Sequence, residues 1–509
     1  MAAKNTSRKS KKAIEKIETG IEGFDLIADG GIPRGRACLV AGTAGSAKTI
    51  FATQFLSAGI YKKGEHGVFV TFEESPEDIR KNMMSFGWDI GRLEKEGKWA
   101  FVDASPQPSS DQIESGSYDF GALLARIEHA VRNIGASRVS MDSLGAVFNQ
   151  FADSSLVRKE LFRISVALKK MKVTAVLTAE RNQEYGGITR FGIEEFVADS
   201  VVILRNVLED EKRRRTVEIL KFRGTYHQKG EFPFTIFPHQ GIMVIPLSAL
   251  ELKQKSSYKR ITSGSSELDR MCGGGFFRDS IVLVSGATGA GKTLIVTQFM
   301  KGGFTSGERC LLLGFEESRE QLMRNAIGWG IDFNRMEAEG KLKIACEYPE
   351  ATSLEDLLIR IKNIMEEFKP HRVAVDSLSA LERVSTTKGF REFVISLTSF
   401  IKHQEVAGLF TATTSNLIGG TSITEAHIST ITDSIILLRY VEMYGEMLRG
   451  LTVLKMRGSM HDKDIREFLI DGKGMHIGKP FRTVSGILTG TPMQMVPERL
   501  QRLDAMFKE

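Results

Sequence analysis

Short apolar runs recur along the chain, and each is followed by glycine, by acidic residues or by another polar segment. Runs of six or seven such residues are typical of buried β-strands. The predicted strands are 37–42, 67–72 and 137–142 in the first half and 280–286, 310–315 and 371–376 in the second. A longer apolar stretch that contains Gln-Phe follows the first of these strands in each half and predicts a helix. The pattern therefore indicates a strand, loop and helix unit in each half of the chain.

The same motifs occur twice, about one domain length apart. The segment GTAGSAKT at 42–49 matches GATGAGKT at 286–293, and TFEESPEDIRKN at 71–82 matches GFEESREQLMRN at 314–325. The separation falls from 244 residues at the glycine-rich loops to 234 at later motifs such as MDSLGA, from Met141. A repeat of this length indicates duplication of a whole domain and argues against a solenoid of short units.

The 509 residues are too many for one compact core. We predict a first domain at 17–246, a linker at 247–260 and a second domain at 261–478. A basic arm at 1–16 and a C-terminal tail at 479–509 flank them. The end of the tail, PERLQRLDAMFKE, has apolar residues at helical spacing. A helix packed on its own domain and a docking segment for a partner are both open interpretations.

Composition is that of a globular protein, with 42% hydrophobic residues, 26% charged residues and a net charge of +6. The basic stretch from Ser7 to Lys16 is typical of a solvated terminus, with contact to nucleic acid as the alternative. Four cysteines lie far apart without metal-ligand spacing, which predicts free thiols in a reducing compartment. No apolar run reaches the ~18 residues of a membrane helix and no export signal is visible. We therefore expect a cytoplasmic protein.

Each glycine-rich loop lies between a predicted strand and a predicted helix, which is the context of a phosphate-binding P-loop. In such loops, backbone N–H groups surround the phosphates of ATP at a helix N-terminus. Lys292 would reach the β- and γ-phosphates, and the hydroxyl of Thr293 would bind Mg²⁺. Lys48 and Thr49 stand at the same positions of the first loop.

The two loops differ at one position, where the first has Ala47 and the second has Gly291. Alanine is compatible with the first turn of a helix, at the cost of a little room beside the phosphates. We expect nucleotide binding to survive in the first loop, with altered affinity or turnover.

Acidic residues follow two further predicted strands of each half. Asp142 and Asp376 each end a strand, as a Walker B carboxylate near the metal does. A solvated aspartate would be the interpretation of either residue alone, but the repeated P-loop context favours the metal-binding role. Acidic pairs also follow a strand in each half, at Glu73-Glu74 and at Glu316-Glu317. Such pairs are usually surface charge, yet beside a P-loop a carboxylate could polarise water or accept a proton from a hydroxyl nucleophile.

The sequence K-x-R-G ends another predicted strand in each half, with Lys221 and Arg223 in the first half and Lys455 and Arg457 in the second. The neutral interpretation is a solvated strand edge. In ring ATPases, however, cations at such positions often neutralise charge on the γ-phosphate bound by the next subunit.

The two halves differ most where Glu195-Phe196 aligns with Ser429-Thr430. Only the second half has a hydroxyl pair at this position. A Ser-Thr pair in a strand or turn is usually structural, and phosphorylation is the alternative.

Taken together, these motifs resemble the KaiC family of ATPases. The resemblance rests on both P-loops, both Glu-Glu pairs, both K-x-R-G motifs, MCGGGFF from Met271 and HISTITDS from His427, and it extends from about Ile17 to about Pro492. It implies an α/β fold with two tandem RecA-like P-loop NTPase domains, each a mostly parallel sheet flanked by helices. It also implies a two-tiered homohexamer with ATP at the subunit interfaces.

The resemblance further implies slow ATP hydrolysis in the first domain, with Glu73 as the general base. In the second domain it implies autophosphorylation, with Glu316 as the base and as a metal ligand. Thr430 and Ser429 would accept the phosphate, and Thr424 would be a transient phosphate carrier.

Residues that contact nucleotide are implied in the same way. In the first domain these are Gly45, Ser46, Ala47, Lys48, Thr49, Ile50, Ser85, Lys221, Phe222, Arg223, Thr225 and His227. In the second domain they are Thr288, Gly289, Ala290, Gly291, Lys292, Thr293, Leu294, Trp329, Arg449, Lys455, Met456, Arg457, Ser459, His461 and Lys463. Arg383 matches an arginine near the acceptor hydroxyls and the γ-phosphate. Phe237-Pro238 replaces the Thr-Asp pair that is common in the family, so contacts there are expected to differ.

The leading hypothesis is an ATP-dependent serine/threonine autokinase, autophosphatase and slow ATPase in a circadian or related timing system. The implied partners are a KaiB-like protein and, in addition, a KaiA-like protein or a histidine kinase that carries the output. The tail diverges after Thr491-Pro492 and is shorter than the one with which KaiC engages KaiA, which weakens the expectation of a KaiA-like partner. One alternative is a RecA- or DnaB-like DNA-dependent ATPase, against which stand the small net charge and the lack of a basic-aromatic segment. The other is a nucleotide-switched scaffold without autophosphorylation.

Overall fold

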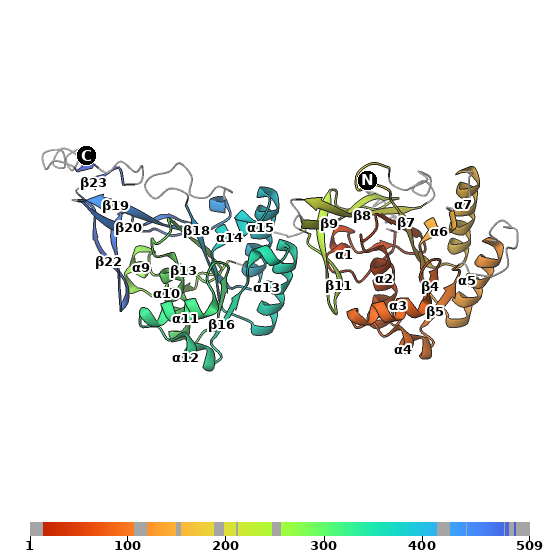
Figure 1. Cartoon of the computed structure of the whole chain (residues 1–509), viewed down its shortest axis with the longest axis horizontal. Helices are drawn as coiled ribbons and strands as arrows, with labels where there is room; N and C mark the ends of the chain where they lie inside the picture. Colours follow the sequence, from red (N-terminus) through yellow and green to blue (C-terminus); the bar gives the residue numbers. More distant parts are fainter. Residues whose placement is uncertain are drawn as a thin grey trace, which may run out of the picture. The chain divides into compact units, whose positions relative to one another are not determined.

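The computed structural model describes residues 14–105, 120–148, 154–187, 198–209, 212–246, 256–414, 428–443, 445–482, 484–487 and 493–494. The chain divides into two compact units, at 1–249 and 250–509. Each unit contains a large, mostly parallel sheet with helices on both faces (Figure 1). The α/β fold predicted from the repeats is confirmed.

The sheet of the first unit has nine strands in the order β11-β10-β9-β8-β3-β7-β6-β4-β5. Neighbouring strands are parallel from β8 to β5, and β8 to β11 form antiparallel pairs. The strands of the whole unit, of which β1 and β2 form a separate small sheet, are β1 Lys16–Ile17, β2 Ile32–Pro33, β3 Ala37–Gly42, β4 Gly67–Thr71, β5 Trp99–Asp103, β6 Arg138–Asp142, β7 Thr174–Glu180, β8 Ser200–Glu209, β9 Lys212–Phe222, β10 Glu231–Phe237 and β11 Gly241–Val244. The helices are α1 Phe24–Ile27, α2 Lys48–Lys63, α3 Pro76–Met83, the 3₁₀-helix η1 Met84–Phe86, α4 Ile90–Lys95, α5 Phe120–Ile134, α6 Leu144–Phe148 and α7 Ser154–Lys170.

The second unit repeats this arrangement, with the strand order β16-β15-β17-β18-β14-β19-β20-β21-β22. The strands are β12 Arg260–Ile261, β13 Phe276–Phe277, β14 Ile281–Gly286, β15 Cys310–Gly314, β16 Leu342–Cys346, β17 Arg372–Asp376, β18 Ala407–Thr413, β19 Ser434–Met443, β20 Glu446–Met456, β21 Arg466–Asp471, β22 Gly474–Pro480, β23 Val484–Ser485 and β24 Met493–Gln494. The helices are α9 Ser266–Met271, α10 Lys292–Thr305, α11 Arg319–Gly328, α12 Phe333–Ala338, η3 Pro349–Ala351, α13 Leu354–Phe368, α14 Leu378–Arg383, α15 Thr387–His403 and η4 Ile428–Thr430.

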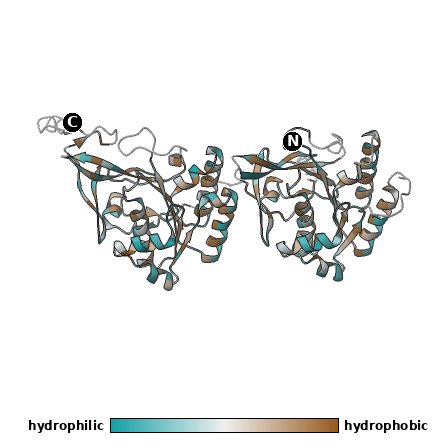
Figure 2. Ribbon diagram, in the orientation of Figure 1, coloured by the Kyte–Doolittle hydropathy of each residue, from teal (hydrophilic) through white to brown (hydrophobic). Residues whose placement is uncertain are grey.

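The strands of the parallel part read as continuous apolar runs because both of their faces are buried. A strand turns alternate side chains to opposite faces of its sheet. In β3, Cys38 and Val40 belong to the core that contains α2, whereas Leu39 belongs to the core that contains α5 and α7. Hydrophobic residues accordingly concentrate on the sheets and hydrophilic ones on the outer helices (Figure 2).

A buried arginine ties together three segments of each unit. The Nε atom of Arg372 lies 2.6 Å from Glu308, and its Nη1 atom donates to the carbonyl of Thr262 at 2.6 Å. Arg138 makes the matching contacts in the first unit, to Glu65 and to the carbonyl of Glu18. Since each arginine side chain is 1% exposed, each carries its charge into the core only because these partners surround it.

These arginines occupy space that a neighbouring helix leaves open through a glycine. A Cβ atom on Gly59 of α2 would lie 2.3 Å from Nε of Arg138, and one on Gly303 of α10 would lie 2.8 Å from Cδ of Arg372. Glycine inside a helix costs roughly 1 kcal/mol relative to alanine. Here that cost accompanies the close approach of the guanidinium group.

The structure corrects one expectation about the N-terminal arm. Lys16, its last predicted residue, lies in β1 with a side chain only 10% exposed, and its Nζ atom donates to the carbonyls of Ala28 at 2.6 Å and Tyr226 at 3.0 Å. Its ammonium group is therefore engaged within the first unit. Among the helices that the structure describes, none combines the length and hydrophobicity needed to cross a membrane.

Arg372→Met should destabilise the second unit by about 3 kcal/mol, because the change removes a partner of a buried carboxylate and the donors to two carbonyls. Urea unfolding of the full chain, with limited proteolysis to show which unit opens, measures this loss. The matched control is Arg335→Met, which removes an exposed i,i+4 pair with Glu339 and should leave the free energy of unfolding nearly unchanged. Equal losses in the two variants would contradict the assignment.

The pH dependence of this effect follows from Glu308. Burial alone would raise its pKa, but Arg372 and Arg278 outweigh burial and hold the pKa below its usual value. The ion pair therefore contributes its full stability above roughly pH 4.3, the usual pKa of glutamate, and loses it as pH falls through the lower pKa of the folded state. The difference between Arg372→Met and the unmodified chain should shrink on acidification through that window.

Candidate nucleotide site

Parallel strand pairing brings the predicted site residues of each unit to one edge of its sheet. In the second unit, Gly286 at the end of β14 pairs with Thr413 at the end of β18, and Gly314 at the end of β15 pairs with Asp376 at the end of β17. The P-loop follows Gly286, and the Glu316-Glu317 pair follows Gly314. The first unit has the same registers. Carboxyl ends of parallel strands are where open α/β sheets bind ligands.

Each P-loop is followed directly by a helix whose first residue is the predicted lysine. Helix α10 begins at Lys292, and the Nζ atom of this lysine donates to the carbonyls of Gly286 and Ala287, both at 3.0 Å. Lys48 makes equivalent bonds in the first unit, at 3.0 and 2.9 Å. Burial lowers the pKa of both lysines, while nearby carboxylates act in the opposite direction. The cation therefore lies at the helix N-terminus, where a phosphate group would gain most from it.

The expectation for Ala47 is wrong in its structural reason. Helix α2 begins one residue later, at Lys48, and Ala47 precedes it in the left-handed conformation with φ 76°. Gly291 has the same role before α10, with φ 107°. Because a Cβ atom is strained in this region, alanine brings backbone strain to the first P-loop.

The Walker B candidates are held by threonine hydroxyls on two sides. Thr411 from β18 and Thr293 from the P-loop helix both donate to Asp376. In the first unit Thr178 and Thr49 donate to Asp142. Burial raises the pKa of both aspartates, and the hydroxyl donors only partly offset this effect. Such a carboxylate gains from a nearby cation, which fits a role in binding a metal ion.

Sequence reasoning did not identify Thr178 and Thr411 as site residues. Both stand near the end of a strand that directly neighbours the P-loop strand. The signal was present in the repeat, since Thr-Ala occurs at 178–179 and again at 411–412.

The acidic pairs lie beside these aspartates. Burial, followed by the charges of Glu180 and Asp142, raises the pKa of Glu73. In the second unit an oxygen of Glu316 lies 3.2 Å from Nη2 of Arg383. The second member of each pair has a separate anchor, since the side chain of Asn325 donates to Glu317 at 2.8 Å. The first member of each pair instead lies near a cationic side chain, Lys48 for Glu73 and Arg383 for Glu316.

Antiparallel strands contribute an arginine contact to each P-loop. The Nε atom of Arg449 lies 3.4 Å from the carbonyl of Gly289, and its guanidinium lies over the ring of Tyr440. Arg215 makes the corresponding contact in the first unit, with Nε 3.5 Å from the carbonyl of Gly45. Arg449 was predicted and Arg215 was missed, although the repeat could have identified it, since Arg215 lies 234 residues before Arg449.

The K-x-R-G motifs lie at the opposite end of the sheet from the P-loop of the same unit. The first residue of β8, Ser200, pairs with Cys38 near the amino end of β3. Phe222, inside the first K-x-R-G motif, pairs with Ser200. The structure therefore does not bring Lys221 or Arg223 to their own P-loop.

The second unit separates the same groups. Met456, inside its K-x-R-G motif, pairs with Ser434, which pairs with Val282 near the amino end of β14. The predicted acceptor Thr430 is exposed in η4, four residues before β19, and its carbonyl accepts a bond of 3.0 Å from Arg457. Acceptor and K-x-R-G motif thus lie together, at the end of the sheet away from their own P-loop.

Other predicted residues are distributed between these regions. The side chains of Phe222, Leu294 and Met456 are buried, so any contact with nucleotide would come from their backbone atoms. Trp329 packs on the core of the second unit, and Ser85 is exposed in η1. Residues that follow β9 or β20 are Thr225, His227, Ser459, His461 and Lys463. Thr424 and the side chain of Ser429 lie outside the described part of the chain, as do most of the tail and the residues from 247 to 255.

Comparison with known proteins agrees with this arrangement. A family model described as "ATPase: KaiC" matches residues 17–249 and again 261–481. The chain is 71% identical over 496 residues to "Circadian clock protein KaiC3" of Synechocystis sp., which covers 97% of this chain and 98% of the relative.

Two further relatives carry the name "Circadian clock oscillator protein KaiC". The chain is 55% identical over 502 residues to the one from Thermostichus vulcanus, with 99% of this chain and 96% of the relative covered. It is 53% identical over 497 residues to the one from Synechococcus elongatus, with 98% and 95% covered.

The contrast between the two P-loops gives a paired prediction. Ala47→Gly should stabilise the first unit by about 1 kcal/mol in the absence of nucleotide, because glycine adopts the left-handed conformation without a Cβ clash. Gly291→Ala should destabilise the second unit by about 2 kcal/mol or more, since the new Cβ would also lie 2.6 Å from Cε1 of Phe468. Urea unfolding of both variants measures the two changes. Changes of the same sign in both units would contradict this account.

Proposed function

The chain belongs to the KaiC family of ATPases, and from this premise we propose that it is an ATP-dependent serine/threonine autokinase, autophosphatase and slow ATPase in a circadian or related timing system. One observation carries the proposal. In each unit the P-loop and the acidic residues lie at one end of the sheet, while the cations of K-x-R-G lie at the other. A complete site therefore needs a second copy of the chain.

Strand registers give the scale of this separation. In β14, Val282 pairs with Ser434 and Gly286 pairs with Leu438. Those four residues span roughly 13 Å of strand, and Thr430 precedes Ser434 by four more residues. Its hydroxyl is thus far from its own P-loop, and a neighbouring copy would have to supply the nucleotide. This geometry supports ATP between subunits, with each K-x-R-G motif acting on the nucleotide of its neighbour. The homohexamer itself follows the family pattern.

The residues at the carboxyl edge fit ATP with Mg²⁺. The hydroxyl of Thr293, the carboxylate of Asp376 and the nearby Glu316 are hard oxygen donors, as Mg²⁺ prefers. In the described residues no group of three or more His, Cys, Asp or Glu side chains forms a metal-binding cluster, which is consistent with an ion held largely by phosphates and water. When bound, Mg²⁺ would neutralise charge on the β- and γ-phosphates.

The proposed chemistry differs between the two units. In the second unit Glu316 accepts the proton of a Thr430 or Ser429 hydroxyl as the oxygen bonds to the γ-phosphorus and the bond to the β–γ bridging oxygen breaks, releasing ADP. In the first unit Glu73 orients water for the same attack, which releases phosphate. Lys292 and Lys48 hold the phosphates during these steps. Arg383, 3.2 Å from Glu316, directs this carboxylate toward the acceptor.

Further parts of the proposal rest on the family alone. Thr424 acts as a transient phosphate carrier, and the other implied nucleotide contacts follow the family pattern. The first domain spans 17–246 and the second 261–478. Partners are a KaiB-like protein and, in addition, a KaiA-like protein or a histidine kinase, and the protein acts in the cytoplasm.

Incubation of the full chain with Mg²⁺ and ATP should place phosphate on Ser429 and Thr430 within a day. Phosphopeptide mass spectrometry measures the phosphate on each residue. Glu316→Gln should slow this phosphorylation by about 10²- to 10⁴-fold, because the hydroxyl loses its proton acceptor. Glu73→Gln is the matched control, and it should lower ATP hydrolysis while phosphorylation persists.

Two outcomes would contradict the proposal in different ways. Steady hydrolysis with both hydroxyls unmodified would favour a nucleotide-driven switch without autophosphorylation. Equal phosphorylation in the Glu316→Gln variant would remove Glu316 from the role of base.

A further inference from the structure

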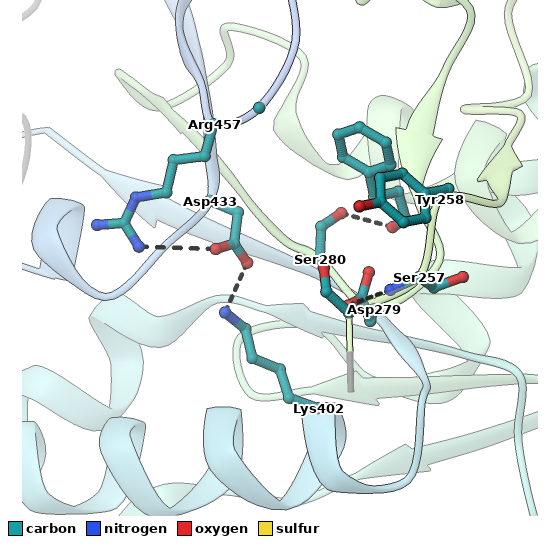
Figure 3. Close-up of a pocket in the computed structure, with 10 residues that line it drawn as sticks. Ser257, Tyr258, Asp279, Ser280, Lys402, Asp433 and Arg457 are labelled. Carbon is teal, nitrogen blue, oxygen red and sulfur yellow. Dashed lines mark hydrogen bonds and ion pairs between the residues drawn. The ribbon is translucent and has the colours of Figure 1, made fainter. Parts of the chain in front are cut away.

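A Lys–Asp–Arg network holds the K-x-R-G motif of each unit. In the second unit, Lys402 at the end of α15 places Nζ 2.7 Å from Oδ2 of Asp433, and Nη1 of Arg457 lies 3.7 Å from Oδ1 of the same carboxylate (Figure 3). The network lines a pocket of about 420 Å³, whose other side carries Tyr258 and Ser280. A single carboxylate thus links a helix to the arginine.

The first unit contains the same network, which the sequence motifs did not predict. Lys169 at the end of α7 places Nζ 2.7 Å from Oδ2 of Asp199, and Nη1 of Arg223 lies 3.9 Å from Oδ1. In both units the backbone N–H of the arginine donates to the carbonyl of the aspartate, at 3.0 Å for Arg223 and 2.9 Å for Arg457. The aspartate therefore anchors the arginine by its main chain and by its side chain.

Asp433 is itself fixed to the sheet. One oxygen of its carboxylate accepts the N–H of Ile281 at 2.9 Å, and its own N–H donates to the carbonyl of Ile281 at 2.9 Å. Ile281 begins β14, the strand whose other end carries the P-loop. The side chain of Asp433 is 18% exposed, whereas that of Arg457 is 55% exposed. A largely buried carboxylate thus holds a guanidinium group that is more than half exposed.

From this arrangement we propose that Asp433 and Asp199 are positioning residues, which aim Arg457 and Arg223 at the nucleotide of the neighbouring copy. The inference rests on the proposed function, because it takes the action of these arginines across the subunit interface as given. An arginine side chain has many rotamers, and fixing it before the reaction avoids that entropic cost in the transition state. The second cation, Lys402 or Lys169, balances the charge of the aspartate and stays with its own unit.

The bond from Arg457 to the carbonyl of Thr430 adds a consequence for the second unit. The same guanidinium group is held by Asp433 and by the acceptor segment. Asp433 therefore keeps the arginine and the acceptor segment of one chain in a common position, although they would serve nucleotide on another chain.

Asp433→Asn tests the proposal in the assembled full chain carrying Glu73→Gln, so that remaining ATP turnover reports on the second unit. Asparagine keeps an oxygen for the N–H of Ile281 but removes the charge that holds Arg457. We expect kcat to fall about tenfold or more with KM for ATP changed less than about threefold, since the loss concerns the transition state. Asp433→Glu should restore part of the loss.

A double-mutant comparison separates positioning from a structural role. Arg457→Met should lower kcat at least as much as Asp433→Asn, and the double variant should lie within about twofold of Arg457→Met alone, because the two residues act as one unit. Lys402→Met, which removes only the other partner of the carboxylate, should leave kcat within about threefold. Losses that multiply in the double variant would overturn the inference.

Failure of the proposed function gives a different result. If Arg457→Met leaves kcat unchanged in an assembled protein, the action of this arginine on a neighbour is wrong and the inference falls with it. If Arg457→Met lowers kcat but Asp433→Asn does not, only the positioning role is wrong. Asp199→Asn, made in a chain that carries Glu316→Gln, is the corresponding variant for the first unit. Loss of assembly in both aspartate variants, measured by native mass spectrometry, would assign them a structural role and overturn positioning.

Discussion

Parallel pairing of the central strands is the constraint on which the rest of this structure depends. Because β14, β15, β17 and β18 point the same way, the segments that follow them meet at one edge, although they are separated by many residues in sequence. The acceptor segment precedes β19, which also runs parallel to β14, and the antiparallel strand β20 returns the K-x-R-G motif to that same opposite edge. Topology alone therefore divides the proposed chemistry between two copies of the chain.

Buried ionisable side chains also gather at the carboxyl edge of the sheet in each unit. Burial raises the pKa of Asp142, Asp376 and Glu73 and lowers that of Lys48 and Lys292. Carboxylates lie close together there, and hydrogen bonds from threonine hydroxyls offset only part of the rise in the aspartate pKa values. Perturbed groups of this kind cluster at functional sites. Nucleotide with its metal ion would supply the missing counter-charges.

The sequence predicted the strand–loop–helix units, the α/β fold and the family, because these depend on local pattern and on the repeat. The identity of the residues at the carboxyl edge followed from their position after strands, and their individual roles stay predictions. The conformation of Ala47 could not be predicted, since handedness at one residue depends on how the whole loop closes. Arg215 was missed although the repeat places it 234 residues before the predicted Arg449, and only its contact with Gly45, 170 positions away, shows its place beside the P-loop. Thr178 could have been found from the repeat.

The close packing of Arg138 against Gly59, and of Arg372 against Gly303, constrains how such a chain can diverge over time. A methyl group at either glycine would displace the guanidinium group, and loss of the arginine alone would leave a buried carboxylate and open space beside the helix. Either substitution made first would destabilise the unit, whereas joint changes of helix, strand and carboxylate could avoid the loss. Both halves of the duplicated chain accordingly contain the same trio of glycine, arginine and glutamate.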